Sequence, residues 1–138
     1  MSEQQTITAT LSTDERFSFF FEVLTKTGLN AVLSGPGPFT ACAPTNEAFR
    51  RLSPIAFDAV MQDPEGQMTR VLQYHILFGM LVQRDLKKLN FPKTRLGTTV
   101  EINERAGVVV INAAKVIIPD ILCSNGVIHG IDAVLIPK

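Results

Sequence analysis

The stretch FTACAPTNEAF, residues 39–49, joins two kinds of local structure. Its first part, residues 39–43, is a short run typical of a buried strand. Pro44 ends that strand because proline has no amide hydrogen to donate. Thr45 or Asn46 can then accept hydrogen bonds from the free amides at the start of a helix. The stretch therefore predicts a buried strand that leads directly into a helix.

The length and composition of the chain indicate one folded domain. Of its 138 residues, 46% are hydrophobic and 19% are charged, a balance typical of a globular protein with its own core. Thirteen basic residues balance thirteen acidic ones, which argues against a nucleic-acid partner, because phosphate-binding proteins usually carry a basic excess. No apolar run reaches the roughly 20 residues that span a membrane. The N-terminal residues lack the pattern of a signal peptide, which leaves open a cytoplasmic protein or a processed form of an exported one.

The first half of the chain predicts helices. Residues 12–15 offer capping side chains for a helix that reaches about Lys26 and stops near Gly28. At helical spacing this segment has one wide apolar arc, which we expect to be buried on two sides. The arc consists of Phe17, Phe19, Phe20, Phe21, Val23 and Leu24.

After about residue 74 the pattern changes from helices to strands. Start signals at Ser53-Pro54 and Asp63-Pro64-Glu65 predict the last helices before this change. Residues 99–103 and Val108–Ile111 are typical of strands. Asn125-Gly126 is a turn dipeptide in front of a further apolar strand. Helices followed by strands, without a repeat or a linker, predict a single α+β domain.

Three motifs in this order resemble those of the fasciclin domain family. FTACAPTNEAF is similar to the family's first block, and SNGVIHGIDAVLIP, residues 124–137, is similar to its second. Between them, Tyr74-His75 followed by Gly79 matches the family's Tyr-His segment. The sequence departs from the family's pattern at Cys42, Gly130 and Phe78-Gly79, and the resemblance still covers nearly the whole chain. It implies a compact α+β fold in which two small sheets, arranged as a β-wedge, pack against a group of helices. We expect a single stand-alone domain over residues 1–138, with its core at about 5–137.

Both histidines are candidates for chemistry. Tyr74, the only tyrosine, lies beside His75 in the apolar stretch VLQYHILFGM, residues 71–80. This imidazole could be a catalytic base, a metal ligand, a binding epitope or a buried polar group that locks the fold. We favour the last role for His75 and His129, because no nucleophile and orienting group accompany either one in sequence. A metal would need a third ligand from Asp120, Asp132 or a cysteine, which the spacing does not supply. We expect no metal and no cofactor.

Several motif residues are expected to support the fold. Thr45 and Asn46 supply helix-start chemistry, and Asn125-Gly126 supplies a turn. The complete set with a predicted structural role is Thr45, Asn46, His75, Asn125, Gly126, His129 and Asp132. Cys42 and Cys123 are expected to be free and reduced, since a chain of this length can hold its core without a bridge.

Partner binding has two candidate segments. Ile118-Pro119-Asp120-Ile121 resembles the Pro-Asp-Ile motif of matrix-type fasciclin domains, which has been proposed as an integrin-recognition element. A proline-stiffened loop would offer Asp120 as a carboxylate and Ile121 as an apolar anchor. The alternative is that Pro119 ends a strand, Asp120 caps the turn and Ile121 fills the core. The resemblance also implies receptor binding by the Tyr74-His75 segment, as in some animal matrix members. We expect Asp120 and Ile121 to contribute more, since Tyr74 and His75 are embedded among apolar residues.

The resemblance implies a non-catalytic module for cell adhesion or for binding a matrix or surface. Its partner would be a cell-surface or matrix protein or a polysaccharide, and its location secreted, periplasmic or at the cell surface. Two other functions remain open. One is a carrier or sensor that holds a small apolar ligand between the wedge and the helices, near residues 17–21. The other is an enzyme that uses His75 or His129.

Overall fold

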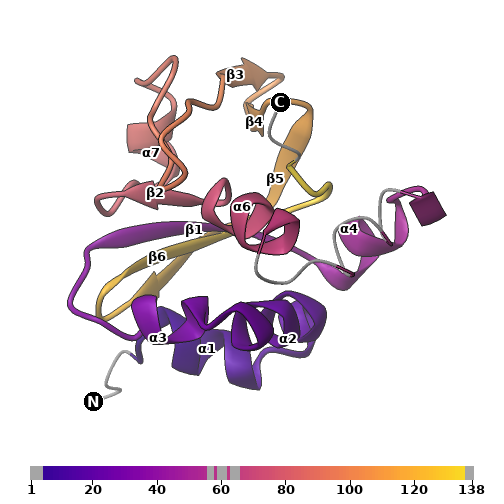
Figure 1. The fold of residues 1–138 in the computed structure, drawn as a ribbon. Coiled ribbons are helices and arrows are strands. Elements are labelled where there is room, and N and C mark those ends of the chain that lie inside the picture. Colours follow the sequence, from indigo (N-terminus) through magenta and orange to yellow (C-terminus); the bar gives the residue numbers. More distant parts are fainter. Residues whose placement is uncertain (1–4, 56–57, 59–61, 63–65, 136–138) are drawn as a thin grey trace.

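The structure is a computed structural model, and it describes residues 5–55, 58, 62 and 66–135 (Figure 1). The helical elements are α1 (Ile7–Thr13), the 3-10 turn η1 (Glu15–Phe17), α2 (Ser18–Thr27), α3 (Leu29–Val32), α4 (Asn46–Arg50), α6 (Gln67–Gln73) and α7 (Gln83–Leu86). The strands are β1 (Phe39–Pro44), β2 (Ile76–Phe78), β3 (Ile102–Arg105), β4 (Val108–Ile111), β5 (Ala114–Cys123) and β6 (Gly126–Ile131). The α+β class is as predicted.

All six strands form one curled sheet in the order β2-β1-β6-β5-β4-β3 (Figure 1). Strands β1 and β6 are parallel, and every other neighbouring pair is antiparallel. The predicted division into two small sheets is therefore wrong. The prediction fails because of the length of strand β5, which has ten residues. It pairs with β4 at its first residues and with β6 along the rest, and so joins both halves.

The N-terminal helices differ from the predicted single helix. Thr6 caps α1 by accepting a hydrogen bond from the Ala9 amide, and this helix was missed because its threonine-rich sequence has low helix propensity. Asp14 caps the turn η1 instead of a long helix. Gly28 ends α2 in the left-handed conformation, as predicted. The signal at Asp63-Pro64-Glu65 lies outside the described residues, and α6 ends at Gln73 as expected.

The core has two parts, one on each face of the sheet. Ala41 and Ala43 face the part covered by helices, whereas Cys42 between them faces the other part, as side-chain alternation along a strand requires. On the helix side, Phe17 and Phe20 are fully buried and Phe19 is partly buried. In Figure 1, α1, α2 and α3 lie together along one side of β1 and β6. The predicted burial of this aromatic arc is thus confirmed for its central members.

The late strands correct two further predictions. Residues 118–121 were expected to form a loop, but they lie inside β5, where the pairing with β6 is irregular between Val116 and Ile121. Strand β3 begins at Ile102 rather than at residue 99. A turn is found where it was predicted, but it is shifted by one residue: Cys123 pairs with Gly126, so the two-residue hairpin loop is Ser124-Asn125 and Gly126 is the first residue of β6.

Gly126 has no room for a side chain. A Cβ atom at this position would lie 1.9 Å from the carbonyl oxygen of Phe39 on the parallel strand. We expect Gly126→Ala to lower the free energy of unfolding by more than about 3 kcal/mol, because β1 and β6 would have to separate. Urea titration measures this change.

The matched control is Gly107→Ala. Gly107 has a positive φ of 82° but no atom within 4 Å of an added Cβ, so its cost should be only about 1 kcal/mol of backbone strain. Equal losses in both variants would show that conformation, and not the close approach to Phe39, explains the glycine.

Candidate functional site

Asp120 is presented by a bulge in strand β5. Its φ is 58°, a left-handed conformation that aspartate tolerates better than most residues. Its side chain is 45% exposed, and its Oδ1 atom accepts a hydrogen bond of 2.7 Å from the Gln83 amide at the start of α7. No hydrogen bond to Oδ2 is seen within the described residues. The result is an exposed carboxylate on a backbone that is held in place.

His129 fixes this bulge from inside the protein. Its Nε2 donates to the carbonyl oxygen of Leu81 at 2.7 Å, and its Nδ1 accepts from the Asp120 amide at 3.2 Å. Both bonds require the neutral imidazole with its proton on Nε2. Burial lowers the pKa of His129, against smaller opposing effects of the Leu81 bond and the Asp120 charge. With no exposed surface, the ring works as a structural group.

The Gly79–Gln83 part of the chain, here called the crossing segment, connects β2 with this bulge. Thr40 on β1 holds it by donating to the Gly79 carbonyl at 2.6 Å and accepting from the Leu81 amide at 2.8 Å. Together with the bonds of His129 and Asp120, these contacts tie the segment to three strands. Sequence reasoning missed it, because neither Thr40 nor Leu81 carries a local signal for such long-range pairing.

Tyr74 and His75 lie inside the protein. His75 Nδ1 donates to the Val71 carbonyl at 2.7 Å, and its Nε2 accepts from the Leu135 amide at 2.9 Å. Burial is the main effect that lowers the pKa of His75, to about 4. The Tyr74 hydroxyl donates to the Thr99 carbonyl at 3.2 Å and is 3.0 Å from the Asn112 amide nitrogen. In this structure both rings are occupied by packing and internal hydrogen bonds.

The other motif residues also bond within the fold. Asn125 accepts from the Ile7 amide and donates to the carbonyls of Leu33 and Gly35. Asn46 accepts from the Phe19 amide and donates to the Glu15 carbonyl and the Ser18 hydroxyl.

Thr45 and Asp132 also form hydrogen bonds within the fold. Thr45, rather than Asn46, is the N-cap of α4. Asp132 accepts from the Lys115 amide at 2.8 Å and forms an exposed ion pair with Arg51. The Thr45 side chain therefore acts locally, through the Ala48 amide, whereas that of Asp132 joins segments that lie far apart in sequence.

Both cysteines are free and buried. They face opposite sides of the sheet, since Cys42 belongs to one part of the core and Cys123 to the other. Burial raises the pKa of the Cys42 thiol to about 12 and also raises that of Cys123, so neither is a thiolate near neutral pH. Among residues 5–55, 58, 62 and 66–135, no cluster of three or more metal-binding side chains is found.

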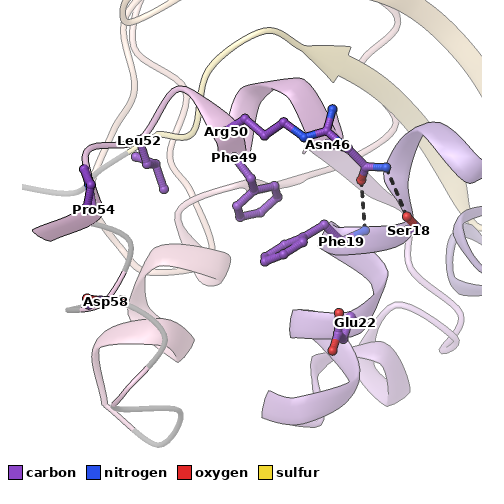
Figure 2. Close-up of a pocket in the computed structure, with 9 residues that line it drawn as sticks. All are labelled: Ser18, Phe19, Glu22, Asn46, Phe49, Arg50, Leu52, Pro54 and Asp58. Atoms are coloured by element: carbon purple, nitrogen blue, oxygen red, sulfur yellow. Dashed lines mark hydrogen bonds between the residues drawn. The ribbon is translucent and has the colours of Figure 1, made fainter.

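A groove of about 600 Å³ lies between α2 and α4 (Figure 2). Phe19 and Phe49 form its aromatic wall, with ring centroids 4.7 Å apart. An apolar ligand was predicted near residues 17–21, and of the four phenylalanines in that run only Phe19 lines the groove. The other lining residues are Ser18, Glu22, Asn46, Arg50, Leu52, Pro54 and Asp58.

The fold is thus an α+β domain with one mixed sheet. Its distant segments are held together by hydrogen bonds of buried side chains, including both histidines. The chain belongs to the fasciclin domain family. The family profile described as "Fasciclin domain" matches residues 15–137, so one such domain covers nearly the whole chain. Fasciclin domains are generally non-catalytic binding modules.

Similar proteins come from bacteria and animals. The chain is 42% identical over 123 residues to "Uncharacterized protein sll1735" of Synechocystis sp., covering 89% of this chain and 91% of that protein. It is 32% identical to pig transforming growth factor-beta-induced protein ig-h3 and 30% identical to human periostin, over 96% and 92% of this chain. It spans only 19% and 15% of those two proteins.

The solved structure of a FAS1 domain pair from the insect cell adhesion molecule fasciclin I shares the fold. Its TM-score is 0.83 at 21% identity, over 98% of this chain and 52% of that one. No helix within the described residues is long and apolar enough to cross a membrane.

The two buried histidines predict acid sensitivity. The folded pKa of His75, about 4, lies below its ordinary value of 6.5, so the unfolded chain binds more protons between these values. Stability should therefore be fully present above pH 6.5 and fall as the pH drops, by about 3 kcal/mol at pH 4. His129, whose pKa is lowered too, adds in the same direction. Urea unfolding between pH 7 and 4 measures the loss.

The interval from pH 6.5 to 5 is the most diagnostic, because ordinary carboxylates titrate little there. Imidazole NMR serves as the control and should show no titration of His75 above pH 5. A flat stability profile over this interval would contradict the assignment of both rings as neutral structural groups.

Proposed function

We propose that this domain is a non-catalytic adhesion module that binds a cell-surface or matrix component through the bulge at Asp120. The observation that carries the proposal is the exposed carboxylate on a fixed backbone. Because its amide and its Oδ1 atom are both held by neighbouring elements, Asp120 loses little conformational freedom on binding. A carboxylate in this setting could complete a divalent-cation site on a receptor.

Apolar side chains on the same strand add contact area. Ile117 and Leu122 on β5 are 50% and 48% exposed. Ile121 is only partly buried, with one side packed on the helix-side core. A surface that combines an exposed carboxylate with aliphatic side chains is better suited to bind a protein than a purely polar surface would be. Tyr74 and His75 remain secondary candidates, since a partner would reach them only after local opening.

The family supports an adhesive role. Fasciclin domains bind matrix and surface components generally, and the solved structure with the same fold belongs to an insect cell adhesion molecule. We propose that the domain acts outside the cytoplasm, in a secreted, periplasmic or cell-surface location. One such surface binds weakly alone, so adhesion would depend on several copies acting together.

Asp120→Asn is the variant that tests this function. Asparagine tolerates the left-handed backbone and can still accept from the Gln83 amide, so only the charge is lost. We expect at least about a tenfold loss of adhesion of the tagged protein to cells or isolated matrix, the usual effect of removing an interfacial charge pair. Chelation of divalent cations should produce a similar loss in the wild type.

Asp85→Asn is the matched control, since Asp85 is an aspartate on the neighbouring helix α7. Tyr74→Phe and His75→Gln complete the comparison, with folding checked by circular dichroism. Normal adhesion of Asp120→Asn together with its loss in a folded His75→Gln would place the contact at the Tyr-His segment and refute the proposal.

A further inference from the structure

A second cavity, of about 590 Å³, lies on the side of the sheet away from α1–α3. Its lining combines apolar groups such as Val134 and Leu135 with polar ones such as Glu101 and Asn112. Phe91 lines it as well and is 63% exposed. The cavity includes neither Asp120 nor Ile121 among its lining residues, so it is separate from the proposed adhesive contact.

Phe91 is exposed although the backbone around it is fixed. The carbonyl of Asn90 accepts from the Ile102 amide at 2.8 Å, and that of Pro92 accepts from the Val100 amide at 3.1 Å. Both flanking residues are thereby tied to the chain entering β3. An aromatic ring held at a cavity rim contributes little to the core, but it offers a preorganised flat apolar face to a ligand.

The polar lining of the cavity suits a ligand rich in hydroxyl groups. Glu101 keeps a carboxylate there, with Oε1 accepting from the Asn103 amide group at 2.7 Å. The Tyr74 hydroxyl and Asn112 form a bonded pair beside it. Hydroxyl groups can donate to such oxygens, while the C–H face of a sugar ring can stack on Phe91.

Basic residues are concentrated in the segment of the chain that carries Phe91, the aromatic residue of this cavity. Residues 84–95 contain five of the thirteen basic residues and one of the thirteen acidic ones, so this segment carries +4 and the remaining chain −4. The backbone of Lys93 forms an antiparallel β-bridge with that of Thr99, a lining residue of the cavity. Arg84 and Lys88 are exposed, and within the described part of the chain Lys87 alone of this segment's basic residues forms an ion pair, with Glu104 at 3.5 Å. A local field of this sign attracts anionic polymers.

We infer that this cavity and the basic segment form a binding site for an acidic polysaccharide, one that carries carboxylates or sulfates along its chain. A sugar ring occupies the cavity against Phe91, and Lys88 and Lys93 face the anionic groups of the neighbouring units. An anionic membrane is the less favoured partner, because Phe91 lines a cavity of mixed polar and apolar groups instead of projecting alone from the surface. The inference is independent of the function proposed for Asp120.

The test measures binding of the full chain to polygalacturonate, dextran sulfate, neutral dextran and phosphatidylcholine–phosphatidylglycerol vesicles. We expect binding to both acidic polymers, weakened by salt, and none to dextran. Phe91→Ala should weaken it about tenfold, whereas Phe78→Ala should not. Phe78 is the matched control, because it is 52% exposed on β2.

Charge variants complete the design. Lys88→Gln and Lys93→Gln should each weaken binding severalfold, whereas Lys115→Gln, at an exposed lysine on β5, should not. Asp120→Asn should leave polysaccharide binding unchanged, which separates this site from the adhesive one. The inference fails if Phe91→Ala binds like the wild type, if dextran binds as well as polygalacturonate, or if only the vesicles bind.

Discussion

The parallel pairing of β1 with β6 is the interaction on which the rest of this structure depends. It joins Phe39–Pro44 to Gly126–Ile131, two segments separated by most of the chain. Every residue of these strands is buried apart from Phe39, which is partly so. Parallel pairing needs a long connection, and here that connection contains every element from α4 to β5. Closing such a loop costs entropy that the buried contacts of the two strands must offset.

Polar side chains at both ends of this pair extend its influence. Asn125, just before β6, bonds to the start of α1 and to the end of α3. At the opposite end, the Thr45 amide donates to the Ile131 carbonyl, and Thr45 then caps α4. A buried amide side chain that lost these partners would leave several groups unsatisfied. The polar residues of the two sequence blocks therefore serve mainly to hold the elements of the fold together.

The same framework determines which groups remain for binding. His129 lies on β6 and holds the bulge of β5 and the crossing segment at once. It is unavailable for catalysis for the same reason, since both ring nitrogens are engaged. The groups that we propose for binding, the Asp120 carboxylate and the rim at Phe91, are ones that this framework positions but leaves exposed.

The sequence predicted those parts of the fold that depend on local chemistry. Pro44, Thr45 and Gly28 act through nearby backbone groups, and the structure places each as expected. The turn predicted at Asn125-Gly126 lies one residue earlier, at Ser124-Asn125. The bulge at Asp120 could not be predicted, because the group that holds its amide, His129, lies on another strand. The single sheet was missed for a similar reason, since only tertiary pairing shows that β5 serves both halves. The buried state of His75 was correctly inferred from its apolar neighbours, whereas its Leu135 partner is 60 residues away.

Native-state hydrogen exchange tests the central role of the β1–β6 pair most directly. Amides of both strands should exchange only through global unfolding, with an opening free energy equal to that from urea titration. Amides of the β3–β4 hairpin should exchange through smaller local openings. The account would be contradicted if β1 and β6 amides opened at lower free energy than those between β4 and β5.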